Sequence, residues 1–258
     1  MGAALQSRDQ FPRDRDPGFA SDVAFAAILP GSPAASAGIA EGDGLAAIGG
    51  VPITVQPGLE GTMLRDSAYA MLGEHPAGAS LRLTVVHAGF ERVVELLPPS
   101  QCHALVEVLI DGGMKARSED GWVIQLGLSL MQRASEEEVA AIFAHELAHV
   151  VLGHRDRLDR EGVKGGLGGE FGRSRQLGAE AEHEADRLSV HLLANAGYDP
   201  RSVPALWRGP LGRALDAGLL RSRIYGSPET RARSAEREIA EYLAGGPPSW
   251  PGHLLGRR

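Results

Sequence analysis

Residues 134–154 read ASEEEVAAIFAHELAHVVLGH and have the pattern of one amphipathic helix. Ser135 and Glu138 are spaced as a capping box, in which each side chain accepts a hydrogen bond from the other residue's backbone N–H. Acidic residues fill the first turn, where they interact favourably with the helix dipole. Apolar residues follow at helical spacing, namely Val139, Ile142, Phe143, Leu147 and Val150. Gly153 is the predicted end of the helix.

Two histidines and a glutamate stand in the second half of this helix. His145 and His149 are one turn apart and project from the same face, so both imidazoles can reach one metal ion. Glu146 is offset by about 100°, which lets it flank the ion without binding it. This HExxH arrangement is typical of zinc sites in which the glutamate takes a proton from water. The alternative is a surface helix that carries two histidines and no metal.

A zinc site of this kind needs a third protein ligand. His154 is near in sequence, but nine residues of continuous helix correspond to about 900° of rotation, which places it opposite His145. We therefore expect His154 to lie near the carbonyl groups at the helix C-terminus. The metzincin pattern is excluded, because Leu152 and Arg155 stand where it requires Gly and His.

A second helix is predicted within GAEAEHEADRLSVHLLANAGYDP, residues 178–200, and it offers carboxylates. Glu182 and Asp186 are four residues apart and share a face, so either can approach the two histidines. Gly197 and the following proline end the helix. Glu184 and His183 are rival donors, although each points about 100° or more away from the face of Glu182.

The motifs HELAH, EHEAD and GYDP, in this order, resemble the HtpX-like family of gluzincin-type zinc peptidases, which also includes the CAAX prenyl endopeptidases. The resemblance covers residues 102–233. It implies that Zn²⁺ is bound by His145, His149 and Glu182. It also implies that Glu146 is the catalytic general base and that Asp186 orients a ligand histidine.

Two further passages carry the same resemblance. KARSEDGWVIQLGLSLM, residues 115–131, is similar to the family's segment before the metal helix, whose strand is the sheet edge on which substrate is laid. We expect a strand in Trp122–Met131, although its apolar second half also fits a buried helix. YGSPETRAR, residues 225–233, resembles a His-Pro segment followed by Arg, with Ser227 in place of His. Arg233 is therefore a candidate for transition-state or structural support.

The N-terminal part of the chain has a different pattern. Residues 1–19 are polar and offer little to pack, so they are expected to be a flexible arm. Short apolar runs broken by Gly and Pro follow, which favours a small β-rich module. Alternation in LRLTVV and RVVELL around HAG predicts a hairpin, and Arg65–Leu72 is expected to be a short helix.

SPAASAGIAEGDGLAAIGGVPI, residues 32–53, resembles the segment of bacterial PDZ domains that reads Ser-Pro-Ala, Ala-Gly and Gly-Asp before an apolar strand. The resemblance covers about 75 residues. It implies that the module captures a C-terminal or extended peptide by strand addition. The alternative is a spacer of the same shape that binds nothing.

The predicted fold class is therefore α+β, with a PDZ-like domain followed by a mainly helical gluzincin domain that has a short edge-strand sheet. The expected segments are a flexible arm at 1–19, the PDZ-like domain at 20–98, the zinc metallopeptidase domain at 99–245 and a tail at 246–258.

The composition of the chain argues against some classes of binding partner. A net charge of −7 without a basic run argues against binding to nucleic acid. An apolar fraction of 43% is typical of a soluble globular protein, and we find no window that suits a transmembrane segment or a signal peptide. Cys102 is the only cysteine, so we expect it to be a small buried hydrophobe rather than half of an internal disulfide. The oligomeric state stays open.

Leu158–Gly178 joins the two ligand helices and is rich in glycine, so it cannot be regular structure throughout. A lid over the zinc and a surface loop are both compatible with this composition. A fourth protein ligand from this segment, such as Glu170, would favour a latent enzyme or a structural zinc site.

The resemblances together predict a zinc endopeptidase that cleaves extended or unfolded polypeptides in protein quality control. The alternative is a latent peptidase, or a PDZ-type adaptor or holdase with a structural zinc site. By analogy with proteins that join the two modules, the expected location is the bacterial cell envelope or periplasm, with the cytoplasm as the alternative.

Overall fold

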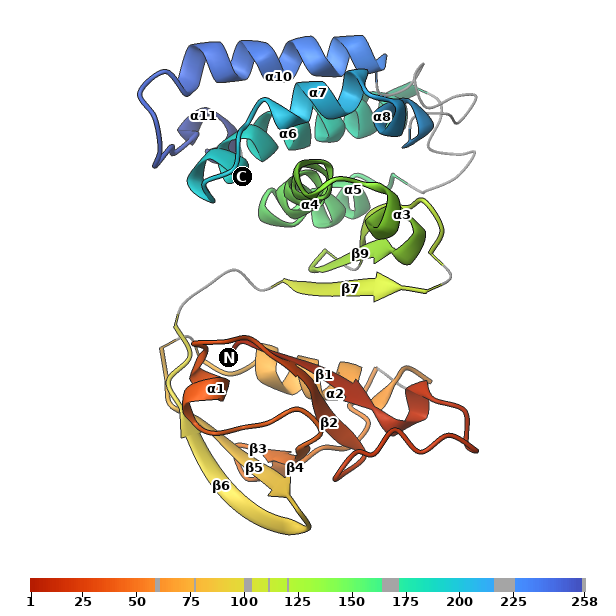
Figure 1. The fold of residues 1–258 in the computed structure, drawn as a ribbon, viewed down its shortest axis with the longest axis vertical. Helices are drawn as coiled ribbons and strands as arrows, with labels where there is room; N and C mark the ends of the chain where they lie inside the picture. The colour runs from red at the N-terminus through yellow and green to blue at the C-terminus, as the bar shows by residue number, and fades with distance from the viewer. Residues whose placement is uncertain are drawn as a thin grey trace. The chain divides into compact units, whose positions relative to one another are not determined.

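The computed structural model describes residues 1–58, 61–76, 78–99, 104–110, 112–119, 121–163, 172–215 and 226–256. The chain folds into two compact units, Met1–Gln101 and Cys102–Arg258. Figure 1 draws the first from red to yellow and the second from yellow-green to blue. Cys102 and Glu170 lie outside the described residues, so what we expect of them stays a prediction.

The first unit is built on a six-stranded antiparallel sheet with the order β1-β2-β3-β5-β6, and β4 pairs with β3. Its strands are β1 (Ala3–Ser7), β2 (Val23–Ile28), β3 (Gly44–Ile48), β4 (Val51–Pro52), β5 (Leu81–His87) and β6 (Phe90–Leu96). Its helices are the 3-10 turn η1 (Arg8–Gln10), α1 (Pro33–Ser36) and α2 (Leu64–Gly73).

The predicted hairpin and the predicted short helix of this unit are both confirmed. β5 and β6 pair from Leu81 opposite Leu96 to His87 opposite Phe90. Ala88 and Gly89 form the turn with φ angles of 49° and 83°, as a two-residue hairpin loop requires.

The expectation of a flexible arm over residues 1–19 is wrong for its first part. Residues 3–7 form β1, which pairs antiparallel with β2. The Leu5 side chain is buried, and its backbone N–H donates to the Tyr69 hydroxyl at 2.7 Å. Backbone pairing with β2 and burial of Leu5 hold this segment in place, although its polar composition alone predicts no packing.

The second unit combines a three-stranded sheet with helices. Its elements are β7 (Leu105–Leu109), β8 (Ala116–Glu119), β9 (Val123–Gly127), α3 (Leu128–Arg133), α4 (Glu136–Val151), α5 (His154–Arg160), α6 (Gly172–Asn195), α7 (Ser202–Arg208), α8 (Pro210–Leu215), α10 (Pro228–Tyr242) and α11 (Gly252–Leu255). The segment 122–131 is thus a strand in its first half and a helix in its second. Among the described helices, none has the length and apolar character needed to cross a bilayer.

The sheet order β7-β9-β8 corrects one expectation about the substrate edge. β9 pairs with β7 on one side and β8 on the other, so its backbone groups are already used. The edge strand next to the metal helix is β8, which precedes β9 in sequence.

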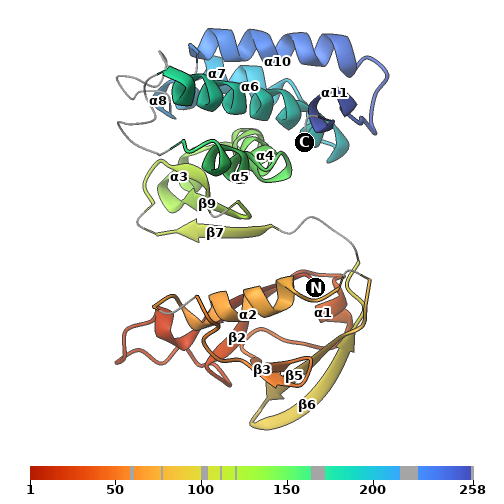
Figure 2. The same ribbon diagram turned by 180° about the vertical axis from the view of Figure 1, so that it is seen from behind.

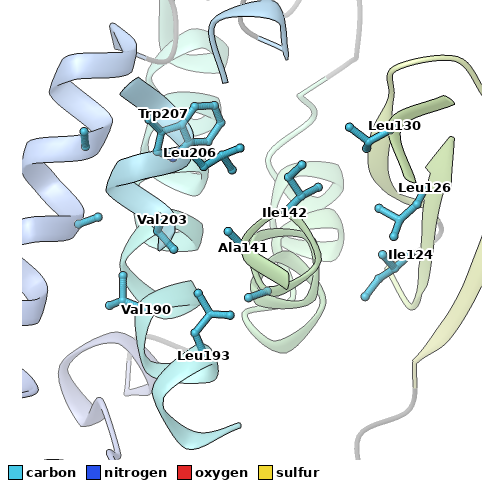
Figure 3. Packing of buried hydrophobic residues seen from close by; sticks show 13 residues of the cluster. Ile124, Leu126, Leu130, Ala141, Ile142, Val190, Leu193, Val203, Leu206 and Trp207 are labelled. Carbon is cyan, nitrogen blue, oxygen red and sulfur yellow. The ribbon is translucent and has the colours of Figure 1, made fainter. Parts of the chain in front are cut away.

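α4 is the central element of this unit and lies between the sheet and helices α6 and α7 (Figure 1). Its predicted capping box is confirmed: the Ser135 hydroxyl accepts from the Glu138 N–H, and the Glu138 carboxylate accepts from the Ser135 N–H. Ile142 on α4 lies between Ile124 of the sheet and Leu206 of α7 (Figure 3). Burying each such side chain stabilises the fold by about 1.5–3 kcal/mol, so α4 is held on two sides.

The C-terminal segment 246–258, which we expect to be a tail, is packed against the second unit over its described residues. Leu254 of α11 is buried in a cluster with Ala148 of α4 and Ala185 and Leu188 of α6. α11 lies near the end of α6 in Figure 2. This apolar contact, together with hydrogen bonds between Ser249 and Asn195, holds the segment against the back of the two ligand helices.

Candidate metal centre

The two histidines of α4 and one glutamate of α6 converge on a single point. His145 Nε2 and His149 Nε2 lie 3.2 Å apart. Glu182 Oε2 lies 3.4 Å from His145 Nε2, and Glu182 Oε1 lies 3.7 Å from His149 Nε2. α4 and α6 pack against each other, and this packing brings together residues far apart in sequence.

The spacing of these donors fits a zinc ion. Ligands about 2.1 Å from a tetrahedral centre are about 3.4 Å from each other, and the three separations between donor atoms, 3.2, 3.4 and 3.7 Å, lie around this value. Two imidazole nitrogens and a carboxylate are also the donor set that catalytic zinc uses. The three side chains are partly exposed and line a cavity of about 660 Å³.

A second group of metal-type side chains, His191, Glu238 and His253, has different geometry. Glu238 Oε1 lies 3.0 Å from His191 Nε2 and 2.6 Å from His253 Nε2, too close for two ligands of one tetrahedral ion. Arg187 donates to the other carboxylate oxygen, and Ser249 Oγ lies 2.6 Å from His191 Nδ1. This group is a hydrogen-bonded network that ties α11 to α6 and α10.

Asp186 lies behind His145, on the side of that ring away from the contact atoms of the other two donors. Its Oδ1 is 3.1 Å from His145 Nδ1, and its carboxylate is fully buried. Arg231 donates to both Asp186 oxygens at 2.6 and 2.8 Å, and Trp207 Nε1 donates to Oδ1 at 3.2 Å. Arg231 also reaches Glu182 Oε2 at 3.2 Å. One arginine therefore connects the third donor to the carboxylate behind His145.

The structure places Arg233 away from this site. Its side chain is 70% exposed and pairs with Glu229 on the same helix. Arg231, two residues earlier, is 4% exposed and stacks on the Trp207 ring at 3.6 Å. Two residues correspond to about 200° on a helix, so only one of the two can face the site. The sequence signal for Arg231 is its i, i+4 spacing to Ala235, which is buried in the core.

His149 has a different kind of partner. Its Nδ1 lies 2.8 Å from Nδ1 of His154, whose Nε2 lies 3.1 Å from Glu184 Oε2. Arg157 donates to the same Glu184 oxygen at 2.8 Å. The expectation that His154 lies near helix C-terminal carbonyls is wrong, because α4 ends at Val151 and His154 begins α5.

The rival donors are not at the metal position. The Glu184 carboxylate contacts His154 and Arg157 instead. In the described part of the chain, His183 belongs to neither group of residues that could hold a metal ion. A hydrogen bond from His154, with help from Arg157 and against the effect of burial, lowers the pKa of Glu184 to about 2. Glu184 is therefore an anion that supports the site from behind.

The pKa values of the two histidines of α4 are shifted in opposite directions. Burial lowers the pKa of His145, but contacts with Asp186 and Glu182 outweigh it and raise the pKa to about 10. Burial lowers the pKa of His149 to about 3. Burial would raise the pKa of Glu182, but His145 and Arg231 lower it well below its usual range. Contacts with two carboxylates thus favour the protonated form of His145, whereas burial favours the neutral form of His149.

Glu146 lies on the same cavity as the three donors. It is 9% exposed and follows His145 on α4. The β8 residues Ala116–Ser118 line the cavity from the sheet side, and Ile142, Leu206 and Trp207 give it an apolar wall. The cavity thus has a carboxylate and an edge strand beside the donors.

The flanking segments are described in part. Ser227 caps α10, because its hydroxyl accepts from the Thr230 N–H, so this residue has a structural contact here. Of the glycine-rich segment 158–178, its first residues end α5 and its last begin α6. Residues 164–171, which bear on the lid hypothesis, lie outside the described residues.

Comparison with known proteins finds a family match in this part of the chain. Residues 115–163 match the model of Peptidase family M48. The matched stretch runs from the start of β8 through α5 and includes His145, Glu146, His149 and His154, while Glu182 and Asp186 follow it. No curated protein matches the chain. The family match supports a zinc-dependent metallopeptidase that acts on polypeptide.

Proposed function

We propose that this protein is a zinc-dependent endopeptidase that hydrolyses peptide bonds in extended or unfolded polypeptides, as in protein quality control. The observation that carries the proposal is the convergence of His145, His149 and Glu182 at tetrahedral spacing, with Glu146 on the same cavity. Zinc in this site would polarise the scissile carbonyl and make the attacking water more acidic.

Three further side chains have separate roles in the proposed reaction. Glu146 accepts the proton of the attacking water and returns it to the leaving amine. Asp186, whose Oδ1 lies 3.1 Å from His145 Nδ1, holds this ring so that Nε2 is directed at the metal position. Arg231 balances the charge of Asp186 and Glu182, so that two buried carboxylates can remain ionised beside each other.

Substrate binding is assigned to the edge of β8. An extended chain added there would form backbone hydrogen bonds that do not depend on its sequence. The cavity beside β8 would receive one substrate side chain, and its apolar wall favours an apolar one. This arrangement suits unfolded polypeptides, because most backbone groups of a folded domain are already hydrogen-bonded within its own helices and strands.

The second candidate function is a latent peptidase, or an adaptor or holdase that binds peptide through a PDZ-like first unit. Ser227, which caps a helix where the family has histidine, favours slow or regulated chemistry. In the first unit, β1 is an edge strand that packs beside α2, which is where strand addition would occur. The cell-envelope location belongs to the same proposal and is tested by cell fractionation.

The testing experiment measures zinc content and cleavage of unfolded casein for the unchanged chain and for Glu146→Gln. We expect about one zinc per chain in both, with cleavage reduced at least 100-fold in the variant, because only the base is lost. Glu180→Gln, an exposed glutamate on α6, is the control and retains activity. Zinc without cleavage in any protein would favour the latent or adaptor function, and absence of zinc would overturn the metal site.

A further inference from the structure

Behind His149 lies a chain of buried side chains that nothing in the proposed mechanism requires. His149 Nδ1 contacts His154 Nδ1 at 2.8 Å, and His154 Nε2 contacts Glu184 Oε2 at 3.1 Å. We propose that His154 and Glu184 are positioning residues which orient His149 for metal binding through this His149–His154–Glu184 relay. The inference rests on the proposed zinc site.

If His149 binds metal through Nε2, the contacts of the relay allow only one placement of the protons on the two imidazole rings. An Nδ1–Nδ1 contact at this distance requires that one nitrogen donates and the other accepts. A neutral His149 that binds metal through Nε2 keeps its proton on Nδ1 and donates it to His154. The neutral His154 ring then carries its proton on Nε2, where the Glu184 carboxylate accepts it. The relay therefore fixes His149 in the tautomer that presents the Nε2 lone pair to the metal.

The backbone turn after α4 makes this contact possible. Gly153 adopts a left-handed conformation with φ of 60°, and a side chain there would meet no other atom. The turn ends the rotation of α4 and starts α5, so His154 points back toward His149 instead of away from it. The His154 side chain is 2% exposed, and such burial without a partner would be costly.

Glu184 reaches His149 only through the intervening ring. On α6 it is rotated by about 200° from Glu182, so the two carboxylates cannot face the same ligand. Arg157 donates to Glu184 Oε2 and keeps that carboxylate in place as an acceptor. The two metal histidines thus have separate anionic supports from α6: Asp186 contacts His145 directly, whereas Glu184 acts on His149 through His154.

The test uses the whole chain and measures the zinc dissociation constant by competition with a chromophoric chelator. His154→Leu removes the acceptor, and we expect zinc binding to weaken about 10- to 100-fold. His154→Gln should recover part of this loss, because its amide can accept from His149 and donate to Glu184. Glu184→Gln, which leaves the His154 ring in place, should give an intermediate loss.

His191→Gln is the matched control, because His191 is an equally buried histidine in a network with no contact to the metal donors. It should lower thermal stability and leave zinc affinity unchanged. Equal losses in His154→Leu and His191→Gln would assign the effect to general stability and overturn the relay.

A second readout is the tautomer of His154, observed by long-range ¹H–¹⁵N correlation spectra of the zinc-loaded unchanged chain. The relay requires a neutral ring with its proton on Nε2, and a proton on Nδ1 would overturn it even if the variants failed to fold. An unchanged chain that binds no zinc removes both the relay and the proposed function. Zinc binding that is the same in His154→Leu removes the relay alone.

Discussion

At the residue scale, the site depends on which side chains of a helix face inward. Arg231 and Arg233 are two positions apart on α10, yet one is 4% exposed beside Asp186 and Glu182 and the other is exposed to solvent. Since Arg231 is buried against two carboxylates, its removal leaves their charge without compensation. The exposed arginine makes one contact within its own helix.

Arg231→Leu is therefore expected to destabilise the second unit by about 3–5 kcal/mol, as is usual when one partner of a buried ion pair is lost. Zinc affinity should fall as well, because Asp186 and Glu182 lose the group that orients them. Urea denaturation and zinc titration measure the two effects. Arg233→Leu is the comparison and should change neither quantity; similar effects of the two variants would contradict this assignment.

At the element scale, α4 is specified almost entirely by its own residues. Ser135 caps its start, acids occupy its first turn, and apolar residues at helical spacing face the core. The turn at its end is different, because the left-handed Gly153 determines where the next residue points. The start of α4 therefore contributes to stability alone, whereas its end contributes to both stability and metal geometry.

Substitutions at the two ends of α4 should separate these properties. Ser135→Ala removes the cap and should cost about 1 kcal/mol of unfolding free energy without changing zinc affinity. Gly153→Ala should cost about 1–2 kcal/mol, because the residue must adopt the left-handed conformation, and should also weaken zinc binding by displacing His154. Denaturant unfolding and chelator competition measure both. Unchanged zinc affinity in Gly153→Ala would contradict the positional role of the turn.

At the scale of the whole molecule, each unit has its own core. In the second unit, the C-terminal helix α11 packs against α4 and α6. Burial would raise the pKa of Glu238, but His191, Arg187 and His253 lower it below the usual range. The carboxylate thus joins α6, α10 and α11 in its ionised form.

The pH dependence of stability follows from this lowered pKa. A group with a lower pKa in the folded state contributes stability above its unfolded pKa, about 4.3 for Glu, and loses it as pH falls through the folded value. The stability difference between the unchanged chain and Glu238→Gln should therefore be constant above about pH 5 and shrink on acidification below about pH 4. Urea unfolding from pH 7 to pH 3 measures it. A difference that grows as pH falls would have the wrong sign.

Removal of metal should affect the two units unequally. Zinc present at 1,000 times its dissociation constant stabilises the folded site by about 4 kcal/mol, and only the second unit holds the three donors. Chelation by EDTA should lower the temperature of one calorimetric transition and leave that of the first unit unchanged. A shift of both transitions would show that the units unfold together.

The sequence by itself determined the elements whose signals are local. The cap and spacing of α4, the β5–β6 hairpin and the pairing of His145 with His149 all depend on residues within a few turns of each other. Helical spacing left both Glu182 and Asp186 open as the third donor, and the family resemblance pointed to Glu182. The mixed α and β fold class could be predicted in the same way, because strand periodicity dominates the first unit and helical periodicity dominates most of the second.

Only the tertiary structure decided which side chains support the metal donors and which terminal segments pack on the two units. Whether Arg231 or Arg233 faces the site depends on how α10 is rotated about its axis against α6. The His149–His154 contact depends on the turn at Gly153, which is lost if the helix is assumed to continue through His154. β1 and α11 are ordered by partners far away in sequence, β2 for one and α6 for the other. Such contacts are set by packing between elements, which the periodicity of one segment does not encode.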